Sequence, residues 1–447
     1  MMIPPNRGVS AASKYKSLIK ARVPHKFNGR RKPNDNSHFY AARVRYCLEM
    51  AAMLGDQALV YSADNKNKIR VGDDTLAVDR RIKINRFFPV DDSPSYLDHD
   101  FPVPGYALTP SGYLQLLPSS TPTLTSDHLG REQFVIPKKG PATVVLRSPN
   151  SPNNIASHLS DLTRHLDIPA RVEEGRRLLV LLVDGGPDFN PNHGTNGFFY
   201  GRFFRDTKLD SLIVTSYCPG DSAMNPVEHL WAPCTRSLTS VYLPSTLPGE
   251  DTPPCRQKIS EEERRRKENN VFNTAMDLVK HVHWRDVSFA GHKISVQVEP
   301  SGGEPQPYGE DFGLVKETIG SSARRLHNSD LSDEYDFVAR HTDKRIGTTI
   351  FFKCAEAECH HCSTNPPRLS ASDMSLLRDF PSPRPSPDRP PHFMSFREAV
   401  RSSRCSPCEY MPQFAAKELG RCLVHGCRYV FTSRKDSDDH RRKVHRR

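Results

Sequence analysis

The chain has 447 residues, of which 36% are hydrophobic, and it carries 38 Pro, 11 Cys and a formal net charge of +11. This length allows about two to four domains of ~100–200 residues, with at least one sizeable core. The longest apolar run, LLVLLV at 178–183, is far too short to cross a bilayer, which argues against a membrane protein.

Positive charge gathers at both ends of the chain. Residues 1–36 hold nine Lys or Arg against one Asp, and residues 396–447 hold 13 against six Asp or Glu. Two basic ends are typical of proteins that bind a polyanion, although many basic tails are only solvated. The first residues lack the apolar region of a signal peptide. We therefore expect a reducing compartment, in which the cysteines favour metal binding over disulfides.

The sequence of residues 1–73 predicts a disordered tail, then a helix and then a strand hairpin. Residues 1–36 are basic and aperiodic, so a disordered tail is expected. Ser37 is the expected N-cap of a helix that ends at Gly55, because apolar residues recur at helical spacing between them. The β-prone run at 58–63 ends at Asp64, and the sequence at 68–73 is predicted to return as the second strand of a hairpin.

The next segments indicate a mixed sheet. Residues 88–153 are rich in Pro, Ser and turn residues, and we expect an irregular insertion with a few short strands. A helix over 155–166 precedes the apolar run at 178–183, and a short helix precedes a second apolar run at 211–217. Continuous apolar runs suit strands buried on both faces. The alternation of strands and helices predicts an α/β sheet layered with helices.

The C-terminal half of the sequence has fewer patterns that predict secondary structure. A charged helix over 260–280, with Ser260 as N-cap, opens a helical or mixed region assigned to 256–350. Residues 351–395 are expected to be a Cys-rich and Pro-rich linker. Residues 396–447 form the last predicted unit.

Three carboxylates hold positions that metal-dependent phosphodiester chemistry requires. Asp64 and Asp184 end two buried strands, and Glu228 lies in the first turn of a helix after the third strand. Cleavage with Mg²⁺ needs carboxylates that converge on ions about 3.5–4 Å apart, held on rigid elements.

The segment from Asp64 to Trp231 resembles the catalytic core of DDE-type transposases and retroviral-type integrases. VDGGPDFN is similar to the turn that carries the second acid, PGDSAMNPVEHLW to the segment with the final Glu, and YSADNKNKI more weakly to the first acid. The resemblance implies an RNase H-like DDE core over 37–245, and Asp64, Asp184 and Glu228 as catalytic residues that use Mg²⁺ or Mn²⁺. It also implies a transposon-derived, nuclear protein with DNA as its partner. The sequence leaves open whether the chain forms a homo-oligomer.

Alternatives remain for each part of this triad. Asp73, Asp74 or Asp79 could replace Asp64, because they lie close by along the chain. The long gap from Asp64 to Asp184 also requires an insertion in the core. NPVE at 225–228 is also a good helix start, with Asn225 as N-cap and Glu228 favouring the helix dipole. The rival hypothesis is therefore a non-catalytic zinc-finger protein that binds DNA or chromatin on an inactive RNase H-like core. A nuclease acting on RNA is a third possibility.

The last residues predict a C2H2 zinc finger, a small ββα unit. Its ligands have the spacing C-x4-C-x12-H-x4-H and are Cys422, Cys427, His440 and His445. Asp436 and Asp439 lie at the helix positions from which such fingers contact DNA bases, and acids there argue against strong sequence-specific binding. The Arg-rich end could still bind DNA phosphates. A lone finger could equally serve protein contacts.

A second group of cysteines is weaker as a metal-site signal. Cys359 and Cys362 form one C-x2-C pair, Cys405 and Cys408 form another, and Cys354 lies nearby. The two pairs could join in a zinc ribbon across the linker, or remain free surface thiols.

Overall fold

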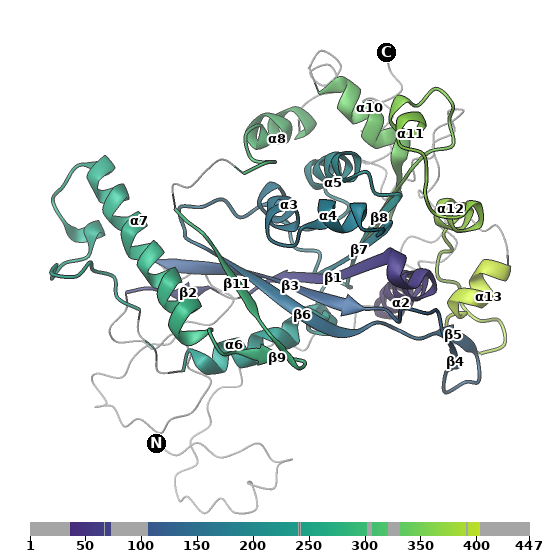
Figure 1. Ribbon diagram of the computed structural model, residues 1–447, viewed down its shortest axis with the longest axis horizontal. Coiled ribbons are helices and arrows are strands. Elements are labelled where there is room, and N and C mark those ends of the chain that lie inside the picture. Colours follow the sequence, from purple (N-terminus) through teal and green to yellow (C-terminus); the bar gives the residue numbers. More distant parts are fainter. Residues whose placement is uncertain are drawn as a thin grey trace, which may run out of the picture.

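A large mixed sheet forms the centre of the molecule in the computed structural model (Figure 1). The structure describes residues 36–66, 68–72, 106–239, 241, 243–301, 306–320, 331–389 and 392–402. Within these residues nine strands form the main sheet, in the order β11-β6-β3-β1-β7-β8-β13-β12, with β2 paired to β3. The chain is therefore an α/β protein with a mixed sheet and flanking helices, as predicted.

The sheet combines antiparallel and parallel strands. The three strands β6, β3 and β1 form an antiparallel meander, and β7 and β8 continue from β1 in parallel. On the far edges, β11 runs parallel to β6, while β13 runs antiparallel to both β8 and β12. The strands span β1 Ala58–Asn65, β2 Ile69–Arg70, β3 Ala107–Leu117, β6 Lys138–Arg147, β7 Leu178–Val183, β8 Ser211–Ser216, β11 Ser295–Glu299, β12 Thr342–Arg345 and β13 Thr348–Phe352.

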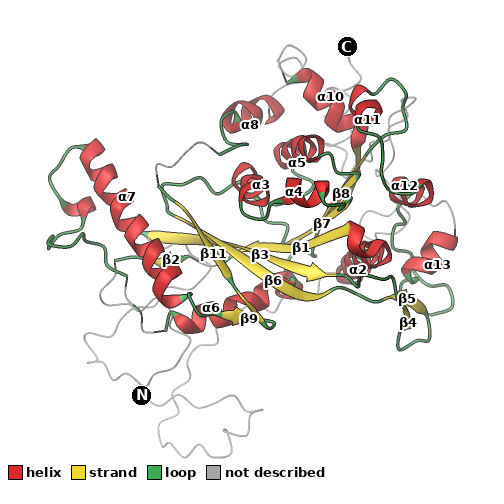
Figure 2. Cartoon of the chain, in the orientation of Figure 1, coloured by secondary structure: helices red, strands yellow, loops and turns green. Residues whose placement is uncertain are grey.

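Helices cover both faces of this sheet (Figure 2). One face packs against α2 (Ser37–Leu54), α6 (Trp231–Ser237), α7 (Glu261–Leu278), α12 (Ala371–Arg378) and α13 (Phe396–Arg401). The other face packs against α3 (Ile155–Arg164), α4 (Ile168–Glu173), α5 (Gly194–Thr207), α8 (Phe312–Gly320) and α10 (Ser332–His341). Short elements complete the description: η1 Gly55–Gln57, β4 Leu124–Ser126, β5 Glu132–Phe134, η3 Ser222–Met224, η4 Pro226–Leu230, η5 Pro254–Arg256, η6 Val279–His283, β9 Ser288–Phe289, β10 His292–Lys293 and α11 His360–Thr364.

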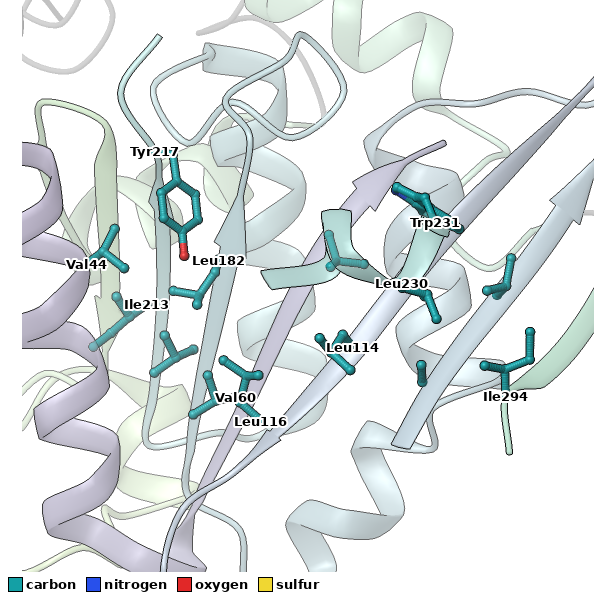
Figure 3. Close-up of a cluster of buried hydrophobic side chains, with 14 of the residues drawn as sticks. Val44, Val60, Leu114, Leu116, Leu182, Ile213, Tyr217, Leu230, Trp231 and Ile294 are labelled. Carbon is teal, nitrogen blue, oxygen red and sulfur yellow. The ribbon is translucent and has the colours of Figure 1, made fainter. Parts of the chain in front are cut away.

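The two central parallel strands explain why the sheet needs two helical layers. Every residue of β7 and β8 is buried. Along β7, Leu178, Val180 and Leu182 belong to one core, and the residues between them belong to the other. Successive strand side chains point to opposite faces, so a continuous apolar run fills both layers. Figure 3 shows Leu182 in the first of these cores, with Val60 and Ile213 from the neighbouring strands.

Two predictions about the middle of the chain are wrong. The segment expected to be an irregular insertion, 88–153, supplies the long strands β3 and β6 of the main sheet. The strand at 69–70 does not return along β1 as a hairpin; it pairs with β3, which is also the antiparallel partner of β1. Pro110 lies within β3, but just beyond the point where the ladder between β1 and β3 ends, so its missing N–H is tolerated.

The C-terminal segments also belong to the main body of the molecule. The region 256–350 contributes β11, β12 and part of β13 to the sheet. The expected linker at 351–395 includes α11 and α12, and Leu369, Met374 and Leu377 lie in the core. Its apolar residues, spaced between prolines, bury too much surface for an extended spacer. Within the described part of the chain, no helix has both the length and the apolar character needed to cross a membrane.

Candidate functional site

Two adjacent parallel strands bring Asp64 and Asp184 to the same edge of the sheet. Ser62 of β1 is in register with Leu182 of β7, so Asp64 and Asp184 occupy equivalent positions two residues further along. Asp64 is the seventh residue of β1 and is buried. Asp184 directly follows β7, and its Oδ1 accepts a hydrogen bond of 2.8 Å from the backbone N–H of Gly186. The strand ends thus fix the two carboxylates side by side, as the sequence predicted.

Glu228 reaches this edge on a 3₁₀ helix tied to β1. Asn225 precedes this helix, η4, but its side chain does not cap it. Instead, its Nδ2 donates to the carbonyl of Ala63 at 3.1 Å, and its Oδ1 accepts from the hydroxyl of Ser62 at 2.5 Å. The backbone N–H of Val227 then donates to the same hydroxyl at 2.9 Å. The predicted capping role of Asn225 is therefore wrong: the residue attaches the Glu228 segment to the strand that carries Asp64.

Asp184 and Glu228 both act on the carboxyl of Asp64. Burial, followed by the negative charge of Asp184 and then by Glu228, raises the pKa of Asp64 to about 9. A buried carboxylate on which the strongest charges are negative is costly to ionise, so the acidic edge favours either a bound proton or a bound cation.

A fourth acid, Asp188, joins this edge and was missed in the sequence. Burial and the charge of Asp184 raise its pKa. The side-chain amides of Asn65 and Asn153 each donate to Asp188 Oδ2 at 3.4 Å. The available signal was its position, four residues after Asp184 in the same turn. We refer to Asp64, Asp184, Asp188 and Glu228 as the acidic cluster.

The acidic cluster is more open than a single-ion site. Among the described residues, two other groups of His, Cys or acidic side chains have their ligand atoms all within 4.8 Å of one another; Asp64, Asp184 and Glu228 are not among them. Two ions about 3.5–4 Å apart would spread their ligands more widely than one ion does. Of the alternative first acids, Asp73, Asp74 and Asp79 lie outside the described residues.

A separate centre gathers one histidine and three cysteines. The ligand atoms of His341, Cys354, Cys359 and Cys362 lie within 4.8 Å of one another, and all four residues are buried. We call this group the Cys3His centre. Cys359 and Cys362 were candidates from the sequence, whereas His341 was missed because its partners lie more than ten residues away along the chain. Cys405 and Cys408, the expected partners of that pair, lie outside the described residues.

Hydrogen bonds orient the Cys3His centre. The Nε2 atom of His341 lies 3.3 Å from the sulfur of Cys362 and 3.4 Å from that of Cys359. On the other side of the ring, Nδ1 lies 2.8 Å from the carbonyl of Phe337, to which it donates. Nε2 is then left with its lone pair toward the thiols, which is how a metal-binding imidazole is oriented. The cluster is compatible with a zinc site.

The remaining close group, Asp161, His165 and Glu299, is an ion-pair network. Asp161 forms a fully buried salt bridge with Arg147 and accepts a hydrogen bond from the Tyr113 hydroxyl at 2.5 Å. His165 Nε2 lies 2.8 Å from Glu299, and this bond lowers the pKa of that carboxyl. Because Arg147 already provides the positive charge, a cation there would compete with it.

The predicted zinc-finger ligands, Cys422, Cys427, His440 and His445, lie outside the described residues. The finger therefore remains a prediction from spacing. Comparisons with models of protein families, with curated proteins and with solved structures gave no match.

Proposed function

We propose that the chain is a transposon-derived protein of the DDE type, with an RNase H-like core, that cleaves and transfers DNA strands with Mg²⁺ or Mn²⁺. The observation that carries this proposal is the meeting of Asp64, Asp184 and Glu228 at the ends of two adjacent parallel strands and a strand-tethered 3₁₀ helix. These acids are more than 40 residues apart along the chain at each step, and the side chain of Asn225 forms no cap on the helix that carries Glu228.

The residues present fit divalent ions. Carboxylate oxygens are the ligands that Mg²⁺ prefers, and few of them are needed. The charges with the largest effect on the pKa of Asp64 are negative, so a cation would relieve their repulsion. Asp64 and Asp184 would flank the ions and Glu228 would complete one coordination sphere. Ions bound there would activate water or a 3′-hydroxyl and stabilise the leaving oxygen.

The rest of the chain has its own part in this proposal. Asn225 and Ser62 position Glu228 relative to Asp64 through the bonds described above. The basic ends of the chain and the C-terminal C2H2 finger would hold DNA, the finger through phosphates more than through bases. A nuclear location follows from DNA as the substrate.

Nicking of DNA by the purified full-length chain tests the proposal. With Mg²⁺ or Mn²⁺ the parent is expected to nick supercoiled DNA, and Asp184→Asn or Glu228→Gln to lower the rate by at least about 100-fold, the size of effect that removal of one key electrostatic group can have. Asp286→Asn is the matched control, because Asp286 is an exposed acid far along the chain that pairs with Arg285 and Lys293.

Each other outcome rejects the proposal in favour of a named alternative. A parent that nicks DNA under no metal condition would support the non-catalytic zinc-finger protein that binds DNA or chromatin on an inactive core. Metal-dependent cleavage confined to RNA strands would support an RNase H-like nuclease acting on RNA. Nicking that survives both substitutions would place the active site elsewhere.

A further inference from the structure

We propose that His341, Cys354, Cys359 and Cys362 bind one structural zinc ion, separate from the C-terminal finger and from the acidic cluster. This inference does not depend on the proposed nuclease activity. It assigns the ligands to a set that includes a distant histidine and leaves out Cys405 and Cys408.

The donor set is complete for tetrahedral zinc. Three sulfurs and one imidazole nitrogen match the Cys3His sites in which zinc has four protein ligands. The four atoms lie within 4.8 Å of one another, which leaves the interior of the group small enough for a single ion. Soft thiolates with an imidazole select zinc over Mg²⁺ or Ca²⁺.

Neither of two other uses of cysteine explains this centre. All three cysteines are free thiols. A disulfide between two of them would also not explain why the third thiol and the imidazole lie in the same group. A Cys–His nucleophile must be reached by a substrate, but His341 is 0% exposed and the cysteines are at most 8% exposed. A buried group without an open position is typical of structural zinc.

The outer contacts prepare the ligands for a metal. The carbonyl of Phe337 fixes the tautomer of His341, as described above. The ring of Phe337 also stacks on His341, with 4.1 Å between their centroids.

The position of the centre indicates what the ion does. His341 ends α10, Cys354 follows β13, and Cys359 and Cys362 lie at the start of α11 and inside it. β13 runs antiparallel to β8, with Phe352 opposite Ser211, so the centre lies near the first residue of β8. The acidic cluster lies beyond the last residue, about 20 Å away for a six-residue strand. Zinc would therefore fasten α10 and α11 to the sheet and take no part at the acidic cluster.

A buried ion pair beside the centre holds the same segment. Lys353 precedes the ligand Cys354, and its Nζ lies 2.8 Å from Oδ1 of Asp210, just before β8. The other oxygen of Asp210 accepts from the backbone N–H groups of Arg368 and Leu369, at 2.6 and 2.7 Å. Both sides of the loop that bears Cys359 and Cys362 are thus attached to one carboxylate. This attachment preorganises the loop for the ion.

Metal analysis of the full chain tests the site in a variant without the finger. Cys427→Ser removes one predicted ligand of the C2H2 site. We expect about one zinc per chain to remain in this variant, and less than about a tenth of one after Cys362→Ser is added, because removal of a ligand weakens binding strongly. Cys255→Ser in the same background is the matched control, since Cys255 is an exposed free thiol.

Two further measurements cover the case in which Cys362→Ser fails to fold. Changing Cys405 and Cys408 to Ser in the Cys427→Ser background should leave the zinc in place; loss of zinc there would overturn the assigned ligand set. Cobalt exchanged into the Cys427→Ser protein should show the absorption of three thiolates in a tetrahedral field. The proposal is overturned by a Cys427→Ser protein with no zinc, by iron in its place, or by zinc that survives Cys362→Ser.

Discussion

At the scale of single residues, two buried carboxylates have opposite surroundings. Asp161 is fully buried but forms a salt bridge with Arg147, whose charge opposes the rise in pKa that burial causes. Asp64 is also buried, yet the charges with the largest effect on its pKa, those of Asp184 and Glu228, are negative. Ionisation of Asp64 without a bound cation would weaken the fold, so a purely structural protein gains little from an acid at this position. This contrast favours a functional reason for the acidic cluster.

His158 is a buried histidine that the fold holds neutral. Its Nδ1 lies 2.8 Å from the Tyr113 hydroxyl, whose single proton goes to Asp161, so Nδ1 carries the hydrogen and donates. Its Nε2 has no hydrogen-bond partner among the described residues. Burial and the charge of Arg147 hold the pKa of His158 well below its ordinary value of 6.5. The ring also stacks on Phe189, with 3.9 Å between centroids.

We predict that His158 makes the fold sensitive to acid. Below about pH 6.5 the unfolded chain binds a proton at His158 that the folded chain does not, so the contribution of His158 to stability falls as the pH drops, by up to about 1.4 kcal/mol per pH unit. His158→Gln should reduce this slope, even though it removes the stacking on Phe189. Urea unfolding at about pH 7.5, 6.5 and 5.5 gives the free energy of unfolding of the parent and of the variant at each pH. Identical slopes in parent and variant would contradict the prediction.

At the scale of elements, the contact between β3 and α6 holds the acidic edge in shape. Gly112 of β3 is the register partner of Asp64. A methyl group on Gly112 would lie 2.4 Å from Cη2 of Trp231, the first residue of α6. Trp231 follows the 3₁₀ helix that carries Glu228. The glycine therefore allows this helix to lie close to β3, the strand next to Asp64.

We expect Gly112→Ala to destabilise the fold by about 1–3 kcal/mol, because overpacking of a close contact forces side chains and backbone to shift. The shift would also move Glu228, so any metal-dependent nicking should fall with it. Urea unfolding gives the first result, and Gly197→Ala is its control. Gly197 lies in α5, with no atom within 4 Å of an added methyl group. Equal stability of Gly112→Ala and the parent would show that Trp231 moves aside freely.

Sequence patterns predicted some elements and missed others, for physical reasons. The apolar runs of β7 and β8, the helix at 37–54 and the Ser260 cap of α7 are local features, and the structure contains each of them. Ser260 accepts from the backbone N–H of Glu263 at 3.2 Å. By contrast, β3 and β6 owe their place to pairing with β1 and with each other. Tertiary pairing overrides a composition rich in Pro and Ser.

At the scale of the whole molecule, the described chain carries two centres at opposite ends of the central parallel strands. The acidic cluster lies at the carboxyl ends of β1 and β7, and the Cys3His centre lies near the start of β8. Parallel neighbours place their carboxyl ends together, which is why Asp64 and Asp184 could be paired from the sequence. His341 could not be paired with Cys354 in this way, because its place depends on how α10 packs against α5.

Direct titration with Mn²⁺, followed by electron paramagnetic resonance, tests the central claim that the acidic cluster binds divalent cations. The full-length parent is predicted to bind one or two Mn²⁺ ions that Mg²⁺ displaces. Asp184→Asn and Glu228→Gln should each weaken this binding at least about tenfold, and Asp286→Asn should leave it unchanged. Equal Mn²⁺ binding by the parent and by both site variants would contradict the account.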